Sequence, residues 1–334
     1  MTSTEITILR ELLGAGSEYV AGTHLAKQLG VSRVAVWMQL QKLASQGFEF
    51  EAAHSRGYRI ARPPANLHET YLHVLLHGRT RLPRIVCLDT VDSTNSEAER
   101  QLAADSPVPL VILAREQTKG RGRRGRPWHS PVAGNLYTTF VFRPELEPAR
   151  LQDFTLWIGL NLCELIANFS RLSPGLKWPN DLHLDGRKVG GILTEARVDA
   201  DQVRDLVLGI GLNLNVRPED LPPEVRATAT SLAAASDTPV DVNRFAAALI
   251  GRVMGAYDQF IAGTHRAKFA DLWQRYDTLR GRPVTVTQGN RTVTGTATGI
   301  DEEGSLIVRL DVGGGSERFR AGEVTLSKEA ALRA

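Results

Sequence analysis

This 334-residue sequence lacks the features that predict disulfides, membrane spans or targeting signals. It has only two cysteines, Cys87 and Cys163, which are too few and too far apart for a disulfide framework or a cysteine metal site. That cysteine usage is typical of a reducing cytoplasm. No run of about 18 apolar residues occurs, so no membrane span is expected. The first residues, MTSTEITILREL, lack a basic region followed by an apolar run, so no signal peptide is predicted.

An excess of charge of one sign is also missing. Forty Lys and Arg residues stand against 37 Asp and Glu, which leaves a net charge of +3. No overall field therefore marks a general nucleic-acid binder, and any basic character must be local. The hydrophobic content of 42% is ordinary for a globular protein. A chain of this length is expected to form two or three domains, because single cores rarely grow beyond about 250–300 residues.

Residues 1–62 are predicted to form a winged helix-turn-helix DNA-binding domain. Apolar residues recur at helical spacing, Gly30 marks a turn, and Ser32 is a plausible N-cap for a second helix. The following GFEFEAAHSRGYRIA predicts two short strands around an HSRG turn. The candidate DNA contacts are Ser32, Arg33, Gln39, Lys42 and Arg56. A helical module that binds no DNA, or that binds another protein, remains an alternative, because Val34, Trp37 and Met38 make the second helix unusually apolar on its exposed positions.

Three further segments follow the N-terminal domain. Residues 63–67, with Pro63 and Pro64, are predicted to be a linker. Residues 68–277 mix strands and helices in an α+β pattern in which hairpins dominate, and Asp185-Gly186 is a strong hairpin turn. Residues 278–334 are rich in short β runs separated by glycine turns, which predicts a small β-barrel. The chain is thus expected to be an α+β multidomain protein.

The stretch TKGRGRRGRPWHS, residues 118–130, contains the pattern G-x-G-x-x-G. A dinucleotide-binding turn needs a helix directly after these glycines, and Pro127, Pro131 and Gly134 argue against one. A loop that closes over a triphosphate fits better, since glycines supply backbone freedom and arginines supply charged donors. A nucleic-acid patch or a solvated basic loop are the alternatives at this point.

Five short motifs occur in a fixed order around this stretch. They are DSTN (92–95), EQTKGRGRRGRPW (116–128), KWPNDL (177–182), GRKVGGIL (186–193) and GIGLNLN (209–215). Together with the helix-turn-helix and the C-terminal barrel, the chain closely resembles the bifunctional biotin protein ligases that double as the biotin operon repressor. The resemblance covers nearly the whole chain. It implies a central mixed α/β domain of the biotin/lipoate protein ligase type and a C-terminal SH3-like barrel.

The resemblance also implies the reaction and its residues. Biotin and ATP, with Mg²⁺, would give biotinyl-5′-AMP, and the biotinyl group would pass to a lysine of the biotin carboxyl carrier protein of acetyl-CoA carboxylase. Lys188, Arg123 and Asp181 are the implied catalytic residues, and Asp181 either holds Mg²⁺ or orients the incoming amine. Nucleotide contacts are implied for Arg124, Trp128, Asn180 and Asn213. Biotin contacts are implied for Ser93, Thr94, Asn95, Gln117, Gly120, Arg121, Gly122, Arg123, Lys188, Gly191 and Gly209.

Regulation and partners follow from the same resemblance. Biotin would also be the precursor of a corepressor, and the adenylate-bound protein would dimerise on operator DNA in the cytoplasm, without a membrane. Residues 217–232, with three prolines, are interpreted either as a second mobile loop over the nucleotide or as a long surface connection. The alternatives are a ligase whose N-terminal domain no longer binds DNA, a lipoate- or octanoate-specific relative, and a sensor with an inactive ligase domain.

Overall fold

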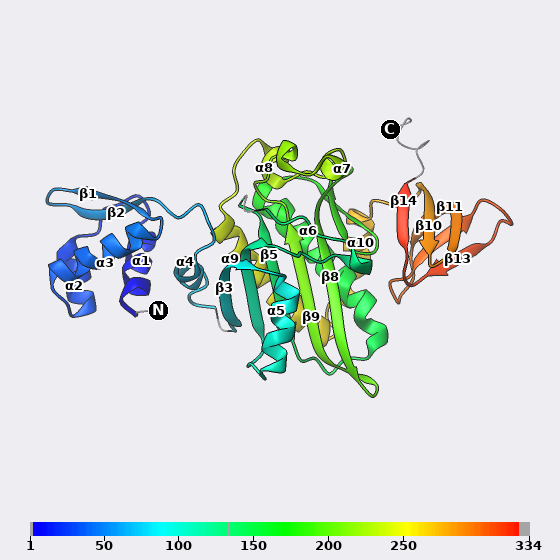
Figure 1. Ribbon diagram of the computed structural model, residues 1–334, viewed down its shortest axis with the longest axis horizontal. Coiled ribbons are helices and arrows are strands. Elements are labelled where there is room, and N and C mark those ends of the chain that lie inside the picture. The colour runs from blue at the N-terminus through cyan, green and yellow to red at the C-terminus, as the bar shows by residue number, and fades with distance from the viewer. Residues whose placement is uncertain (1–2, 80, 132–133, 327–334) are drawn as a thin grey trace. The chain divides into compact units, whose positions relative to one another are not determined.

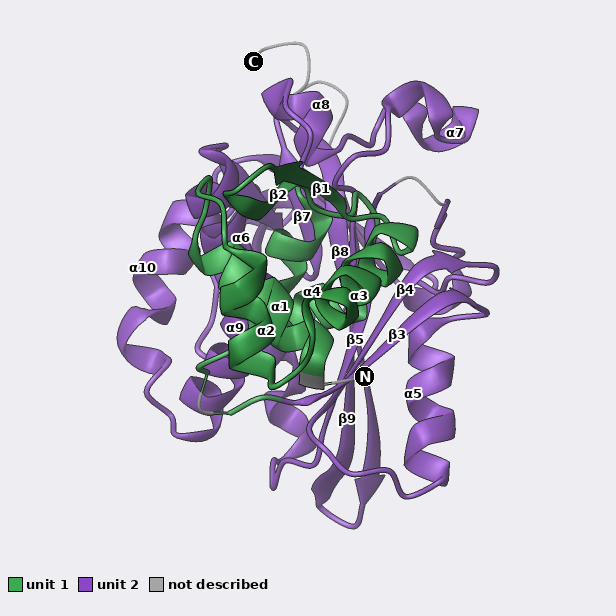
Figure 2. Cartoon of the chain, turned by 90° about the vertical axis from the view of Figure 1, so that its left-hand side faces the viewer, with its two compact units in different colours: residues 1–82, 241–247 green, residues 83–240, 248–334 purple. Residues whose placement is uncertain are grey.

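The computed structural model describes residues 3–79, 81–131 and 134–326. Residues 327–334 of the expected C-terminal domain and residues 1–2 of the N-terminal domain lie outside the described residues. The chain separates into two compact units (Figure 2). The first combines Met1–Leu82 with Asp241–Ala247, and the second combines Pro83–Val240 with Ala248–Ala334.

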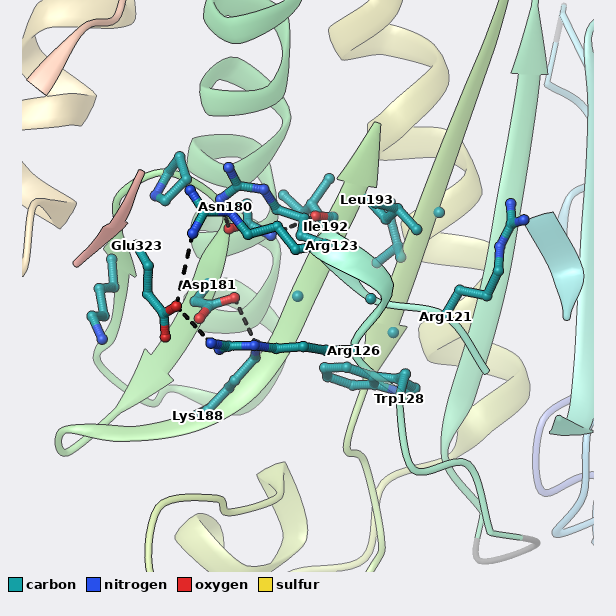
Figure 3. A pocket seen from close by; sticks show the side chains of 18 of the residues that line it. Arg121, Arg123, Arg126, Trp128, Asn180, Asp181, Lys188, Ile192, Leu193 and Glu323 are labelled. Atoms are coloured by element: carbon teal, nitrogen blue, oxygen red, sulfur yellow. Dashed lines mark hydrogen bonds and ion pairs between the residues drawn. The ribbon is translucent and has the colours of Figure 1, made fainter. Parts of the chain in front are cut away.

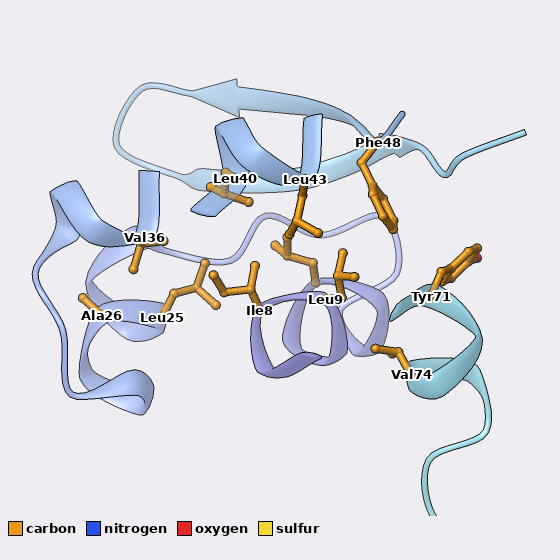
Figure 4. Packing of buried hydrophobic residues seen from close by; sticks show 11 residues of the cluster. Ile8, Leu9, Leu25, Ala26, Val36, Leu40, Leu43, Phe48, Tyr71 and Val74 are labelled. Atoms are coloured by element: carbon orange, nitrogen blue, oxygen red, sulfur yellow. The ribbon is translucent and has the colours of Figure 1, made fainter. Parts of the chain in front are cut away.

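The first unit is a winged helix-turn-helix. Ser32 accepts a hydrogen bond from the backbone N–H of Ala35, which confirms the predicted N-cap of the second helix of the motif. Its hydrophobic core joins the helices to the hairpin that follows them (Figure 4). The elements are α1 (Ser3–Gly14), α2 (Gly22–Leu29), α3 (Arg33–Ser45), β1 (Glu49–Ala53), β2 (Gly57–Arg62) and α4 (Glu69–Leu75), with β1 and β2 antiparallel.

Helix α4 packs with the first unit, although the sequence placed it after the linker in the ligase domain. Tyr71 and Val74 of α4 belong to the same buried cluster as the helix-turn-helix core (Figure 4). The expected linker is also held in place. Asn243 donates to the carbonyl oxygens of Pro64 at 3.1 Å and Asn66 at 2.9 Å. Two prolines end regular structure, but they say nothing about the tertiary contacts that the next helix makes.

The core of the first unit leads to a stability prediction. Leu40 of α3 is 2% exposed, whereas Met38, two residues earlier, is 61% exposed. Leu40→Ala should lower the opening free energy of the α3 amides by about 2–5 kcal/mol because it leaves a cavity. Met38→Ala should change it by less than about 0.5 kcal/mol. Native-state hydrogen exchange measures both, and equal effects would contradict this packing.

The second unit is built on a seven-stranded sheet in the order β3-β4-β5-β9-β8-β7-β6 (Figure 1). Only β3 and β4 pair in parallel, and α5 (Thr94–Ala103) connects them. All other neighbours are antiparallel, which confirms the predicted hairpin-dominated α+β pattern. The strands are β3 (Arg84–Val91), β4 (Leu110–Gln117), β5 (Leu136–Phe142), β6 (Pro174–Lys177), β7 (Asp181–Leu184), β8 (Arg187–Asp199) and β9 (Gln202–Leu212).

Helices cover this sheet, and every residue of the inner strand β5 is buried. Helix α5 packs on β4, β5 and β9, and the long apolar α6 (Leu151–Ser170) packs on β6, β7 and β8. The remaining helices are α7 (Pro223–Arg226), α8 (Leu232–Ser236), α9 (Val242–Ile261) and α10 (Arg266–Tyr276). Within the described part of the chain, no helix combines the length and the apolar character that crossing a bilayer requires.

The C-terminal segment of the second unit is a five-stranded antiparallel sheet in the order β13-β12-β11-β10-β14. The predicted glycine turns are present, with positive φ at Gly289, Gly304 and Gly313. The indole N–H of buried Trp178 donates to the carbonyl oxygen of Gly304 at 2.9 Å and so ties the sheet to the KWPNDL segment. The strands are β10 (Pro283–Gln288), β11 (Arg291–Ile300), β12 (Leu306–Leu310), β13 (Ser316–Phe319) and β14 (Glu323–Leu326).

Candidate functional site

A cavity of about 530 Å³ lies in the second unit, over the ends of β7, β8 and β9 (Figure 3). All five sequence motifs contribute to its wall. The GIGLNLN motif contributes Gly209, Ile210 and Gly211. The C-terminal strand β14 also lines it. The cavity therefore joins segments that are far apart in the sequence, and it is the candidate site.

The arginine loop, residues 118–130, crosses this cavity as a tight hairpin. Gly122 N–H donates to the Arg126 carbonyl oxygen at 2.7 Å, and Trp128 N–H donates to the Gly120 carbonyl oxygen at 2.8 Å. A side chain at position 120 would place its Cβ only 2.4 Å from the Trp128 oxygen, so the closure requires glycine. Gly125, the last of these glycines, ends a single 3₁₀ turn at Arg123–Gly125, and no helix begins in residues 126–131 that follow it. The dinucleotide-binding interpretation is thus excluded.

Positive and polar groups meet at one end of the cavity. The Arg123 guanidinium donates to the Asn180 side-chain oxygen at 2.9 Å, and the Lys188 Nζ lies 2.7 Å from the Asp181 Oδ1. Burial lowers the pKa of Arg123 from its ordinary value, because the charged form loses hydration. Figure 3 shows these four side chains gathered beside Trp128, with Arg121 turned away toward the other side. The arrangement offers two cations to an anionic ligand.

Trp128 belongs to the arginine loop, and its ring packs against the sheet at Gly211. The Lys188 Nζ is 5.3 Å from the centroid of its ring, a cation–π distance. A Cβ at Gly211 would lie 2.6 Å from the Trp128 ring, so this glycine makes room for the indole. The buried Trp128 Nε1 and the buried Arg121 Nε have no hydrogen-bond partner within the described residues. The Trp128 Nε1 packs against the sheet, since a Cβ at Gly211 would lie 2.7 Å from it.

The other wall is built from Ser93, Thr94 and Asn95, all less than 5% exposed. Thr94 donates from its backbone N–H and from its hydroxyl to Gln117 Oε1, at 2.8 and 3.0 Å. Asn95 accepts from the Thr139 hydroxyl at 2.6 Å and donates to Glu195 at 2.7 Å. These contacts hold the side chains in one orientation.

Ser93 and Gly209 add two features to this wall. Ser93 occupies the N-cap position of α5, but its side chain makes no capping hydrogen bond, so the wall is not an ordinary cap. Gly209 lines the cavity, and a Cβ there would lie 2.3 Å from Asn95 Oδ1, so the glycine makes room for a protein side chain.

Arg121 anchors the loop. One of its terminal nitrogens, Nη2, lies 2.9 Å from Glu99 Oε1 and 2.8 Å from Glu195 Oε2. Glu195 also accepts from Asn95, so the loop and the Ser93–Asn95 wall share one carboxylate. Gly122, Arg124 and Gly191 line the cavity as expected from the sequence.

Two of the expected residues, Gly120 and Asn213, do not line the cavity. Asn213 instead donates to the Thr230 carbonyl oxygen at 3.0 Å. Thr230 lies in the segment 217–232, whose backbone also bonds to the backbone of Lys188. The Lys188 N–H donates to the Thr228 carbonyl oxygen at 2.7 Å, and the Thr230 N–H donates to the Lys188 carbonyl oxygen at 2.9 Å. Asn213 therefore fixes the segment that positions Lys188, which is an indirect contribution to the site.

Sequence reasoning missed several lining residues. Glu323 of β14 forms ion pairs with Arg126 and, at 3.9 Å, with Arg124. No local signal marks it, because its place depends on how the C-terminal sheet packs. Lys177 is the first residue of the KWPNDL motif and His183 directly follows its last one, and burial is the main cause that lowers the pKa of each below its ordinary value. Their position on β6 and β7 next to Asp181 was the available signal.

The acidic residues of the cavity are Asp181 and Glu323. The described residues contain no cluster of three or more His, Cys, Asp or Glu side chains that could hold a metal. Mg²⁺ needs no such cage when a nucleotide is present, because one or two carboxylates and the phosphates suffice. Asp181 therefore fits a nucleotide-bound Mg²⁺.

The candidate DNA contacts lie in the first unit. Arg33 is exposed, and the Arg56 guanidinium stacks 4.3 Å from the Tyr19 ring centroid at the tip of the hairpin. Lys42 is paired with nearly buried Glu5 at 2.7 Å. The Gln39 side-chain oxygen is buried without a partner among the described residues. Of the five expected residues, Arg33 and Arg56 remain the best placed for phosphate.

Comparisons with known proteins agree with this organisation. The sequence matches the biotin/lipoate A/B protein ligase family over residues 87–213, the biotin protein ligase C-terminal domain over 280–327, and an HTH domain over 4–59. The bifunctional ligase/repressor BirA of Bacillus spizizenii is 31% identical over 94% of this chain and 96% of its own length. The bifunctional ligase/repressor BirA of Escherichia coli is 30% identical over 93% of this chain and 94% of its own.

Solved structures support the same assignment. The biotin protein ligase from Aquifex aeolicus in complex with biotin and ATP is 28% identical, with a TM-score of 0.63, and covers 73% of this chain and 98% of its own. The predicted fold class, with a helix-turn-helix, a central ligase domain and a small C-terminal β domain, is confirmed. The chain therefore belongs to the biotin protein ligases, within the bifunctional ligase/repressor family whose members carry an N-terminal helix-turn-helix domain.

Proposed function

We propose that this protein is an ATP-dependent ligase that joins biotin to AMP, transfers biotin to a lysine of biotin carboxyl carrier protein, and represses transcription in response to biotin. One observation carries the catalytic part of the proposal. A buried polar wall and two cations meet in one cavity, within a chain of the biotin ligase family.

Biotin binds along the Ser93–Asn95 wall in this proposal. The ureido ring is neutral and needs both donors and acceptors, which the hydroxyls of Ser93 and Thr94 and the amide of Asn95 supply. Gln117 fixes Thr94, and Thr139 and Glu195 fix Asn95. The glycine backbone at Gly209 keeps this arrangement free of steric conflict. Such fixed partners favour one bound orientation of the ring.

Adenylation then requires one anion to approach another. A carboxylate oxygen of biotin attacks the α-phosphorus of ATP, a P–O bond forms, and the bond to pyrophosphate breaks. Lys188 would bridge the carboxylate and the α-phosphate as a point charge, and Arg123 would hold the phosphate from the loop. Trp128, which lines the cavity, would cover the adenine. Asp181 would hold Mg²⁺, which neutralises phosphate charge when bound.

Transfer completes the reaction. The lysine amine of the carrier protein attacks the acyl carbon, the new C–N bond forms, and AMP leaves as the C–O bond breaks. A lysine has a reference pKa near 10.4, so it must lose a proton before it attacks. If Asp181 orients the incoming amine instead of holding Mg²⁺, its carboxylate can accept this proton, and it lies 2.7 Å from the Lys188 Nζ at the cation end of the cavity.

Repression would depend on the first unit. We propose that the winged helix-turn-helix binds operator DNA as a ligand-linked homodimer, with biotinyl-5′-AMP as the corepressor, in the cytoplasm. The support is the HTH match and the similarity to the bifunctional ligase/repressors along almost the whole chain. Arg33 and Arg56 would contact phosphates, and Ser32, Gln39 and Lys42 are the remaining sequence candidates. A gel shift that requires both biotin and ATP would support this proposal.

Isotope exchange between ATP and pyrophosphate tests the ligase proposal. We expect exchange only with biotin and Mg²⁺ present, and its loss when EDTA removes Mg²⁺. Mass spectrometry after incubation should find biotinyl-5′-AMP. Exchange that depends on lipoate or octanoate instead of biotin would assign a different substrate. Biotin binding without exchange would indicate a sensor with an inactive ligase domain.

A further inference from the structure

Helix α3 exposes large apolar side chains on one face. Val34, Trp37 and Met38 are 66%, 50% and 61% exposed. Their i, i+3, i+4 spacing places them side by side on the helix surface. The opposite side of α3 is the one that packs in the core, through Val36, Leu40 and Leu43 (Figure 4). We call Val34, Trp37 and Met38 the α3 apolar face.

The polar residues of this helix have other partners. The Ser32 hydroxyl accepts the Ala35 N–H as the N-cap. Lys42 forms an ion pair with Glu5, whose side chain is only 4% exposed. Gln39 is partly buried, and its amide oxygen has no access to solvent. The hydrogen-bonding groups that normally read base edges are thus few on α3, whereas its apolar surface is extensive.

Two exposed arginines of the first unit carry the charge that DNA phosphates attract. Arg33 is exposed next to Val34, and Arg56 lies at the tip of the β1–β2 hairpin, stacked on Tyr19. The hairpin is fixed to the segment before α2 by the Val20–Tyr58 backbone pair, at 2.8 and 2.9 Å. In helix-turn-helix proteins the second helix enters the major groove with its N-terminal residues on the base edges. The α3 apolar face occupies these N-terminal turns.

An apolar surface in the major groove has one apolar group to contact on the bases, the C5-methyl of thymine. We propose that the α3 apolar face recognises thymine methyl groups, so that the operator half-sites of this protein carry thymines opposite Val34, Trp37 and Met38. This inference rests on the proposed operator binding and adds the chemistry by which sequence is read. Arg33 and Arg56 supply affinity through phosphates, and the methyl contacts supply specificity.

Replacement of thymine by deoxyuridine isolates the methyl group, because uracil keeps every hydrogen-bonding atom of thymine. Full-length protein with biotin, ATP and Mg²⁺ is used to select an operator from a random duplex library. The selected duplex is then synthesised with single thymine-to-deoxyuridine changes. At contacted positions we expect affinity to fall about fourfold per methyl removed. Trp37→Ala should bind the thymine and deoxyuridine duplexes equally at the position that Trp37 contacts.

A matched control uses another exposed apolar residue. Val312 is 85% exposed in the C-terminal segment, and Val312→Ala should retain the full discrimination between thymine and deoxyuridine. A selected site that tolerates deoxyuridine at every position would overturn the inference while leaving operator binding intact. The same holds if Trp37→Ala keeps the discrimination at every position. Failure to select any duplex would overturn operator binding itself, and the inference with it, and would leave a protein partner as the occupant of this face.

Discussion

Replacing Lys188 by methionine should lower biotin-dependent ATP–pyrophosphate exchange by about 10²–10³-fold, the size expected when one preorganised charge contact to a transition state is lost. Methionine keeps much of the apolar stem but removes the ammonium. The substitution also leaves the Asp181 carboxylate, now 2.7 Å from the Lys188 Nζ, without its counter-charge beside an anionic ligand. Both effects raise the barrier to joining two anions.

The fold should survive this substitution. The Lys188 side chain is 35% exposed, and its backbone bonds to Thr228 and Thr230 do not involve the side chain. Lys268→Met, at an exposed position of α10, is the matched control and should keep full exchange activity. If Lys188→Met exchanged within about threefold of the unchanged protein, the assigned role of this ammonium would be wrong.

Gly209→Ala should raise the KM for biotin by about 10²-fold and change the KM for ATP much less. The added Cβ would lie 2.3 Å from Asn95 Oδ1, so Asn95 must move. Asn95 is buried and held by Thr139 and Glu195, which leaves it little freedom to do so. A displacement of about 1 Å at a positioning residue can cost about 10²-fold. Steady-state kinetics with each substrate varied measures the effect.

A second glycine provides the control for this prediction. Gly255 lies within α9, and a Cβ there meets nothing within 4 Å. Gly255→Ala should leave both KM values unchanged and stabilise the helix by about 0.5–1 kcal/mol. A KM for biotin that does not change in Gly209→Ala, or a KM for ATP that rises equally, would contradict the placement of biotin along the Ser93–Asn95 wall.

Local sequence signals predicted most of the elements correctly. The Asp185-Gly186 turn and the Ser32 cap depend on neighbours in the chain, where turn and capping chemistry are readable. The ordered motifs also predicted most of the residues that line the cavity. Their assigned roles stay predictions until the kinetic experiments are done.

The tertiary structure decided the features that depend on packing between distant segments. Glu323 reaches the arginine loop only because the C-terminal sheet is tied to Trp178, and α4 joins the first unit only because Tyr71 completes its core. Likewise, Gly211 belongs to the GIGLNLN motif, but the Trp128 ring is the steric reason for a glycine at this position. Turns, caps and motif order are thus determined by the sequence itself, since they arise between residues near in the chain. Close packing brings distant residues together, and only this packing determines which charges meet and which side chains need a glycine opposite them.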